Sequence, residues 1–172
     1  MSVITTSKNF DEVWARLAER ADLRTAVVGC DKCAKTSRTG GAAEVLAMKA
    51  QFRASNMLLV DAPGLVDAVE EGLCDPKAVP ERLAVLKALL SEIQLLVLSC
   101  GAGLKCVKDT LPGVRIVPGL NTLGPGVKDQ LACLSCGDCR FGTDGCKMMS
   151  IARAQAERLA ASYCAPEVTH GK

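Results

Sequence analysis

The sequence is poor in aromatic residues and in histidine. Only 3% of its 172 residues are Phe, Trp or Tyr, so the core must be built from aliphatic side chains. The set of stacking aromatics that RNA-binding surfaces use is missing as well. The single histidine, His170, lies near the end of the sequence. Catalysis by histidine and metal sites rich in histidine are therefore not expected.

Long apolar runs and an excess of one charge are also missing. The most apolar stretch, residues 93–98, is far shorter than the roughly 20 residues that span a bilayer. The formal net charge is +2, and no run of Lys and Arg suggests binding to nucleic acid or a membrane surface. The first residues lack the basic-then-apolar pattern of a secretory signal peptide. We therefore expect a cytoplasmic protein that binds neither nucleic acid nor membranes.

Cysteine, in contrast, is abundant, with 10 residues. Disulfides are rare in a reducing cytosol, so metal binding or redox chemistry explains this number better. Four cysteines fall within one short stretch, with the spacing C-x2-C-x2-C-x6-C: Cys133, Cys136, Cys139 and Cys146. Consecutive turns bring three thiolates to one centre, and a glycine-rich loop returns the fourth. This spacing is typical of an iron–sulfur cluster, with a zinc ion as the alternative.

Apolar segments and helix-like segments alternate over the first two thirds of the chain. Apolar runs predict buried strands at 25–28, 57–60, 95–98 and 114–117, and extended or irregular structure at 64–72. Helical spacing predicts helices over 9–21, 42–54, 75–91 and 102–109. Continuously apolar strands that alternate with helices are typical of a parallel sheet with helices on both faces.

We therefore predict a small Rossmann-like α/β domain over residues 1–122. Residues 124–126, Gly-Pro-Gly, are interpreted as a linker. A second unit over residues 127–172 would contain the cysteine-rich cluster loop and a terminal helix over 148–161.

Further cysteines follow the predicted strands. Cys30 and Cys33 come directly after the first strand, and Cys100 comes directly after the third. Because the carboxyl ends of parallel strands share one edge, we expect these thiols to converge there. The helices that follow point their N-termini at the same edge, which favours an anionic cluster. For the fourth ligand, Cys74 fits this topology better than the alternative, Cys106.

Two other functions fit parts of this pattern. A zinc ion at 133–146 would make the chain a zinc-stapled structural or interaction module with no redox role. Cys30 and Cys33 could form a thioredoxin-like pair, but no Trp lies beside them and Asp31 opposes thiolate formation. Residues 101–103 supply only half of a dinucleotide fingerprint. Residues 121–122 fit an Asx-type turn better than a contact with the cysteine edge.

The order of these motifs resembles that of the small iron–sulfur subunit (MetV type) of bacterial methylenetetrahydrofolate reductase, a family also named for the C-terminal region of such reductases. The matching segments cover most of the chain: VGCDKC (28–33), TGG (39–41), CDP (74–76), VLSCGAG (97–103), VPGLNT (117–122) and the cysteine block (133–146). The chain departs from the family at Ser37, where a further cysteine is usual. It also has only Cys164 after Cys146.

The resemblance implies an electron-transfer subunit that is not catalytic alone. It implies a partner, the flavin-containing TIM-barrel catalytic subunit of methylenetetrahydrofolate reductase. That subunit's flavin reduces methylene- to methyl-tetrahydrofolate in the one-carbon pathways of anaerobes. It also implies two [4Fe–4S] clusters, one held by Cys30, Cys33, Cys74 and Cys100, the other by Cys133, Cys136, Cys139 and Cys146. From the residues alone, zinc at either site remains an alternative.

Overall fold

The computed structural model describes residues 2–126 of the chain. At its centre is a four-stranded parallel sheet with the strand order β3-β2-β4-β5. These strands are β2 (Arg24–Cys30), β3 (Ala68–Val69), β4 (Ile93–Leu98) and β5 (Arg115–Pro118). The cysteine-rich loop at 133–146 and the helix predicted over 148–161 lie outside the described residues.

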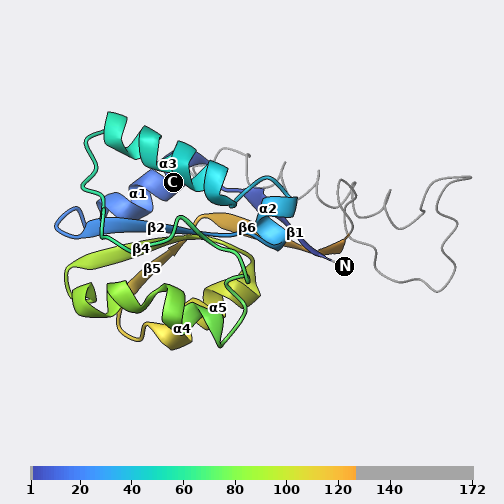
Figure 1. The fold of residues 1–172 in the computed structure, drawn as a ribbon. Helices are drawn as coiled ribbons and strands as arrows, with labels where there is room; N and C mark the ends of the chain where they lie inside the picture. The colour runs from blue at the N-terminus through green and yellow to red at the C-terminus, as the bar shows by residue number, and fades with distance from the viewer. Residues whose placement is uncertain (1, 127–172) are drawn as a thin grey trace, which may run out of the picture.

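Helices cover both faces of this sheet. They are α1 (Phe10–Ala18), α2 (Cys33–Thr36), α3 (Ala42–Ala54), α4 (Ala78–Arg82), the 3-10 helix η1 (Ala84–Leu89) and α5 (Gly101–Thr110). Figure 1 shows α1 and α3 above the sheet and α4 and α5 below it. The predicted α/β architecture with a parallel sheet is confirmed, and α3 has the predicted bounds. Among residues 2–126, no helix combines the length and the apolar character that crossing a membrane requires.

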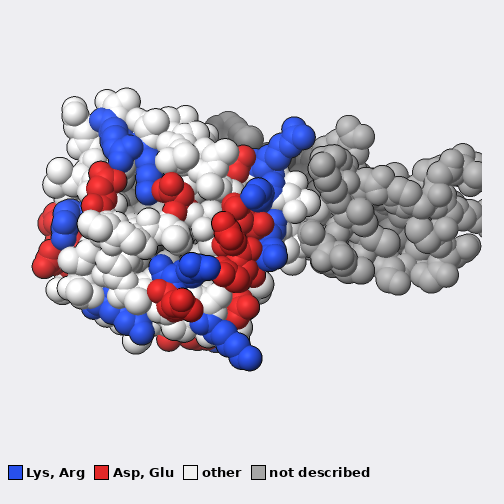
Figure 2. Space-filling model, in the orientation of Figure 1, with Lys and Arg blue, Asp and Glu red and all other residues white. Residues whose placement is uncertain are grey.

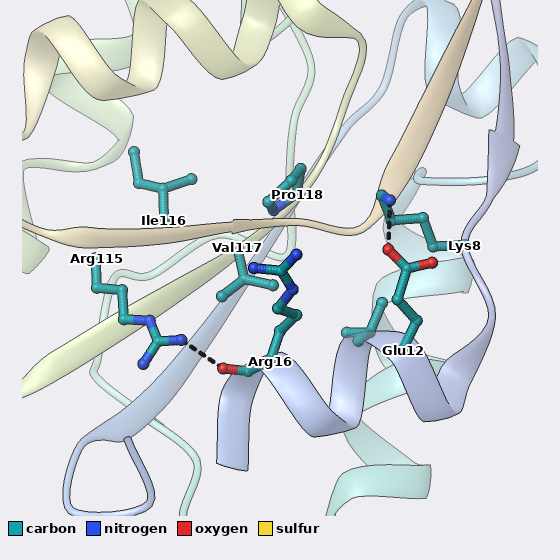
Figure 3. A pocket seen from close by; sticks show the side chains of 8 residues that line it. Lys8, Glu12, Arg16, Arg115, Ile116, Val117 and Pro118 are labelled. Atoms are coloured by element: carbon teal, nitrogen blue, oxygen red, sulfur yellow. Dashed lines mark hydrogen bonds and ion pairs between the residues drawn. The ribbon is translucent and has the colours of Figure 1, made fainter. Parts of the chain in front are cut away.

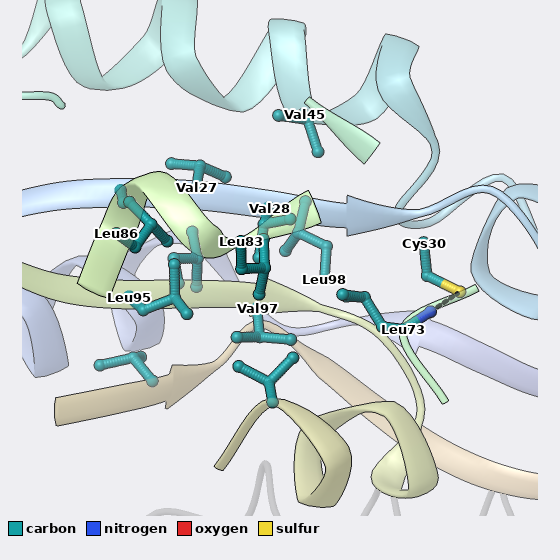
Figure 4. Packing of buried hydrophobic residues seen from close by; sticks show 14 of the residues in the cluster. Val27, Val28, Cys30, Val45, Leu73, Leu83, Leu86, Leu95, Val97 and Leu98 are labelled. Atoms are coloured by element: carbon teal, nitrogen blue, oxygen red, sulfur yellow. Dashed lines mark hydrogen bonds between the residues drawn. The ribbon is translucent and has the colours of Figure 1, made fainter. Parts of the chain in front are cut away.

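The two central strands are buried along almost their whole length. Every residue of β4 is buried, and so is every residue of β2 after Arg24. Continuous apolar burial is what a strand covered by helices on both faces requires. Figure 4 shows the resulting core, in which Val and Leu side chains of β2 and β4 meet Val45 of α3 and Leu86 of η1.

Helix α1 begins after an Asn9 cap and joins α3 through aromatic rings. The Asn9 side chain accepts a hydrogen bond from the Asp11 N–H at 2.8 Å, as an N-cap does. Phe10 and Trp14 pack against Phe52 of α3, with ring centroids 5.5 Å and 6.1 Å apart. Several of the chain's few aromatic residues therefore serve one helix–helix contact.

Residues 57–60, predicted as a strand, touch β2 at a single residue only. The Thr25 N–H donates to the Leu58 carbonyl at 2.7 Å, and the Val60 N–H donates to the Thr25 carbonyl at 2.9 Å. The Leu58 side chain is 64% exposed, which a buried strand does not allow. The strand prediction is therefore wrong here. The edge of β2 is instead taken by β3, which lies within 64–72.

The long helix predicted over 75–91 is broken into two pieces. After α4 the chain turns at Leu83 and continues as the 3-10 helix η1. The buried residues Val79, Leu83 and Leu86 are spaced by four and then by three, which matches the tighter turn of the second piece. Pro80 lies in the first turn of α4, where no intrahelical N–H is needed.

A second sheet, which the sequence analysis does not predict, is an antiparallel ribbon of β1 (Ser2–Ser7) and β6 (Leu120–Gly126). Residues 124–126, interpreted above as a linker, form the end of β6, so the linker interpretation is wrong for them. A boundary at residue 122 would fall inside this strand. The ribbon therefore belongs to the α/β unit.

Candidate metal centre

Two cysteines lie where the strand order of the parallel sheet reverses. From β2 the chain first moves outward to β3, and then returns past β2 to β4 and β5. The crevice between the carboxyl ends of β2 and β4 is therefore the switch point, where open α/β sheets bind ligands. Cys30 is the last residue of β2, and Cys100 is the N-cap of α5 after β4. Both are buried, with 3% and 5% of their surface exposed.

Two further cysteines approach the same crevice from neighbouring segments. Cys33 is the first residue of α2 and is half-buried, and Cys74 follows β3 and is exposed. The pKa of the Cys74 thiol is raised, first by burial and then by the negative charges of Cys30, Cys100 and Cys33. Cysteines that change the pKa of Cys74 in this way lie within electrostatic reach of its sulfur. The structure therefore brings the four predicted ligands of the first site to one edge.

Cys106, the alternative ligand, is not part of this group. Burial is the first cause of its raised thiol pKa, and the charges that raise it further belong to Asp109 and Asp75 rather than to another cysteine. Its nearby Thr110 donates a hydrogen bond to the Cys106 carbonyl at 2.9 Å, within the same helix. Cys106 therefore has the surroundings of a helix side chain packed against the core.

A backbone amide is directed at one sulfur of the site. The Leu73 N–H donates to the Cys30 Sγ at 3.5 Å, and Figure 4 shows this contact at the end of β2. It comes from a turn in which Gly72 has a φ of +97°, a conformation that favours glycine. Amide donors stabilise thiolates and cluster sulfurs. The sequence analysis missed Leu73, because a backbone donor leaves no side-chain signal.

The β1–β6 ribbon braces both halves of the site. Thr122 of β6 accepts a hydrogen bond from the Gly101 N–H at 3.0 Å, next to Cys100. On the other side, the Thr5 N–H of β1 donates to the Ser37 hydroxyl oxygen at 3.3 Å, just after the helix that Cys33 begins. Thr122 therefore does contact the cysteine edge, contrary to the Asx-turn interpretation. Ser37 contacts β1.

Asp31, between the first two cysteines, is engaged by other groups. Its Oδ1 accepts from the Ala42 N–H at 3.1 Å, and its Oδ2 accepts from the Lys35 ammonium at 2.8 Å. Because Gly41, the N-cap of α3, has no side chain, Asp31 supplies the missing cap. The carboxylate thus ties the cysteine loop to the start of α3.

Replacing this cap should loosen the loop at a modest cost. We expect Asp31→Ala to lower the free energy of unfolding by about 1 kcal/mol, the usual loss when an N-cap oxygen is removed. Urea unfolding followed by circular dichroism measures it. Lys35→Ala, which removes only the exposed partner of Asp31, should leave stability nearly unchanged. If both variants lost the same amount of unfolding free energy, the ion pair with Lys35 rather than the cap would account for the loss.

The chemistry of the donors fits a thiophilic metal or cluster, although the side chains are not yet arranged around one. Among residues 2–126, no three His, Cys, Asp or Glu side chains form a group that could hold a metal ion as they stand. Burial and the neighbouring cysteines raise the pKa of Cys74, and thiolates held close together repel until a cation neutralises them. The N-terminus of α5 adds partial positive charge at Cys100. For all four to bind one metal centre, the half-buried Cys33 and the exposed Cys74 must therefore move toward the buried Cys30 and Cys100.

The raised pKa of Cys74 has a direct consequence for its reactivity. A raised pKa leaves less thiolate at a given pH, so alkylation of Cys74 by iodoacetamide in metal-free protein should be slow at neutral pH. The midpoint of its pH–rate profile should lie above the ordinary thiol value of about 8.5. Site-resolved mass spectrometry gives this profile. In urea-unfolded chain the midpoint should return to the ordinary value, and an identical midpoint in both states would contradict the interpretation.

A small pocket lies elsewhere, between α1 and β5. It has a volume of about 260 Å³, and apolar residues such as Val13, Ile116 and Val117 form much of its lining (Figure 3). Three of its charged residues are engaged within the protein, since Lys8 pairs with Glu12 and Arg115 pairs with Glu19. The pocket carries no thiol, and we do not assign the chemistry to it.

On the face drawn in Figure 2, basic and acidic side chains are interspersed rather than separated by sign. Oppositely charged side chains within the described part of the chain form ion pairs, such as Arg82 with Glu71. Comparison of the chain with protein-family models, curated proteins and solved structures finds no match.

Proposed function

We propose that this chain is an iron–sulfur electron-transfer protein. Its first cluster would be held by the thiols at the switch point: Cys30, Cys33, Cys74 and Cys100. Its second would be held by Cys133, Cys136, Cys139 and Cys146, which lie outside the described residues. The observation that carries the proposal is the placement of four cysteines at one sheet edge, after β2, β3 and β4, with the Leu73 N–H directed at the Cys30 sulfur.

The surroundings of the first site suit an anionic cluster. The Leu73 N–H is directed at the Cys30 sulfur, and α5 begins at Cys100. Both features place positive dipole ends near the sulfurs, and such contacts tune the reduction potential of a bound cluster. A cluster carries the electron when bound, and the protein positions it and limits its contact with water.

The identity of the electron acceptor rests on the resemblance noted in the sequence. We propose the flavin of a methylenetetrahydrofolate reductase catalytic subunit, which would reduce methylene- to methyl-tetrahydrofolate. In support, segments quoted for the resemblance lie around the cysteine site. The Cys30 N–H donates to the Gly40 carbonyl at 2.7 Å, and Thr122 binds the Gly101 N–H. These motifs thus supply the frame of the site as well as its thiols.

The decisive experiment is the metal and sulfide content of anaerobically purified protein. Two four-iron clusters require about eight irons and eight acid-labile sulfides per chain, and a brown colour that dithionite bleaches. Zinc without sulfide would overturn the electron-transfer proposal and leave a zinc-stapled module. Thiol-exchange activity without any metal would instead favour a Cys30–Cys33 redox pair.

The partner is tested separately by electron delivery. Protein reduced with dithionite and freed of excess reductant should bleach the flavin of a purified methylenetetrahydrofolate reductase flavoprotein under anaerobic conditions. A matched flavoprotein that does not bind folates serves as the control. Equal bleaching of both flavins would remove the support for this particular acceptor and leave the electron-carrier function standing.

A further inference from the structure

A buried lysine lies on the helix that covers the β3 side of the sheet. The Lys49 side chain of α3 is 9% exposed, and its Nζ lies 2.6 Å from the Oδ1 of Asp67. The Asp67 side chain is 33% exposed, so only the lysine half of this pair is deeply buried. A buried ammonium requires a counter-charge. The pair therefore joins α3 to the residue that immediately precedes β3.

Backbone hydrogen bonds to β2 and the buried side chain of Val69 also hold strand β3. It has two residues and lies at the edge of the parallel sheet. The Gly29 N–H donates to the Asp67 carbonyl at 2.7 Å, and the Asp31 N–H donates to the Val69 carbonyl at 3.1 Å. A strand this short is marginal on its own. The ion pair at its first flank therefore adds a buried contact to a strand that has few hydrogen bonds of its own.

The turn after β3 carries one limb of the cysteine site. The Gly72 N–H donates back to the Val69 carbonyl at 3.1 Å, and the next amide, from Leu73, donates to the Cys30 sulfur. Cys74 follows directly. The position of Cys74 relative to Cys30 thus depends on β3 staying paired with β2.

We propose that the Lys49–Asp67 ion pair is a latch that holds β3 and the turn of residues 72–74 against Cys30. Lys49 is in this sense a positioning residue, since it acts on the thiols through Asp67 and β3 without touching them. The latch itself concerns only this chain's thiols, and only the last test below rests on the proposed function.

The test is the reactivity of individual thiols in reduced, metal-free, full-length protein. N-ethylmaleimide labelling is resolved by mass spectrometry at Cys30 and Cys100. Cys30 is buried under the turn and reacts only when the turn opens, so Lys49→Met should raise its labelling rate by about tenfold. Cys100, at the end of β4, should be labelled at the unchanged rate. Equal increases at both thiols would mean general destabilisation and would overturn the latch.

The chain offers a matched control in a second ion pair from the same helix. Arg53 of α3 pairs with Asp61 at 2.9 Å, but these side chains are 53% and 64% exposed. Because exposed pairs contribute little, Arg53→Met should leave the labelling of Cys30 unchanged. If Arg53→Met raised the labelling rate of Cys30 as much as Lys49→Met does, burial of the ion pair would not matter and the proposal would be overturned.

A second variant and a second measurement guard against loss of the fold. Asp67→Asn leaves the ammonium of Lys49 buried without a counter-charge, so Cys30 labelling should rise at least as much as in Lys49→Met. Hydrogen exchange of residues 67–74 in the protein as purified should also accelerate in Lys49→Met, with residues 93–98 unchanged. Unchanged exchange at 67–74 would contradict the latch.

The last test joins the latch to the cluster. In cluster-loaded protein, a chelator should remove iron from Lys49→Met faster than from Arg53→Met. The iron lost faster should be that of the first cluster, which Cys74 helps to hold. If the protein as purified carries no cluster but Lys49→Met still speeds the labelling of Cys30, the latch stands and the proposed function is overturned. If Cys30 in Lys49→Met is labelled at the wild-type rate and the protein as purified carries the cluster, the latch is overturned and the proposed function stands.

Discussion

Gly40→Ala is expected to cost more than about 3 kcal/mol in the free energy of unfolding, a large part of the roughly 5–15 kcal/mol that domains have. A Cβ at Gly40 would lie far inside contact distance of the Leu98 carbonyl oxygen, 2.9 Å from the Leu98 Cβ and 3.0 Å from the Ala34 Cβ. The main obstacle is backbone, which cannot rotate away. The same residue accepts the Cys30 N–H, so any shift also moves the cysteine loop.

The measurement is urea unfolding of the purified variant, followed by far-ultraviolet circular dichroism. Gly101→Ala is the matched control, since its added Cβ would have Thr122 Oγ1 as its nearest neighbour, at 3.9 Å. This control should stay within about 0.5 kcal/mol of the unchanged chain. A Gly40→Ala protein as stable as the control would mean that the approach of Gly40 to β4 is not as close as described.

Cys74→Ser is expected to remove the first cluster, and Cys106→Ser is expected to keep it. Under the proposed function, iron should fall from about eight to about four per chain in Cys74→Ser, because a four-iron cluster needs all its thiolates. The physical reason for choosing Cys74 is its electrostatic contact with the other three thiols, which Cys106 lacks. Iron and sulfide analysis with electron paramagnetic resonance of the reduced protein measures both variants.

The outcome of this pair decides the fourth ligand. Loss of the cluster in Cys106→Ser alone would show that the helix after Cys100 supplies the ligand and that Cys74 does not. Because the Cys106 side chain is partly buried, its serine variant should first be shown to unfold at the same urea concentration as the unchanged chain. Iron retained in full by Cys74→Ser would overturn the assignment.

The central elements of the fold could be predicted because their sequence patterns are strong and local. The buried runs of β2 and β4 have no polar alternation, and α3 has clear helical bounds. Strand β3 could not be predicted, because two residues carry no pattern and their attachment comes from hydrogen bonds to β2 that no local spacing reports. Residues 57–60 have the apolar composition of a buried strand. Leu58 is nevertheless exposed, because this segment pairs with β2 at one residue only.

The thiols of the candidate site could be predicted from the sequence, but the groups that hydrogen-bond around them could not. Topology alone brought Cys30 and Cys100 to one edge, because parallel strands end together. The Leu73 amide and the Thr122 hydroxyl depend on tertiary contacts that no spacing reports. Asp31 was interpreted as a charge opposing thiolate formation, but its carboxylate accepts from Ala42 and Lys35.

The β1–β6 ribbon has a consequence for biosynthesis. Its register joins Ser7 to Leu120 and Thr5 to Thr122, so β1 must wait for its partner β6, the last described strand, to leave the ribosome. Contacts of such long sequence separation form late in folding. Until Thr122 emerges, the Gly101 end of the cysteine crevice lacks its brace, and residues 133–146 follow only afterwards. Under the proposed function, insertion of metal at the first site would thus begin only after Thr122 has left the ribosome.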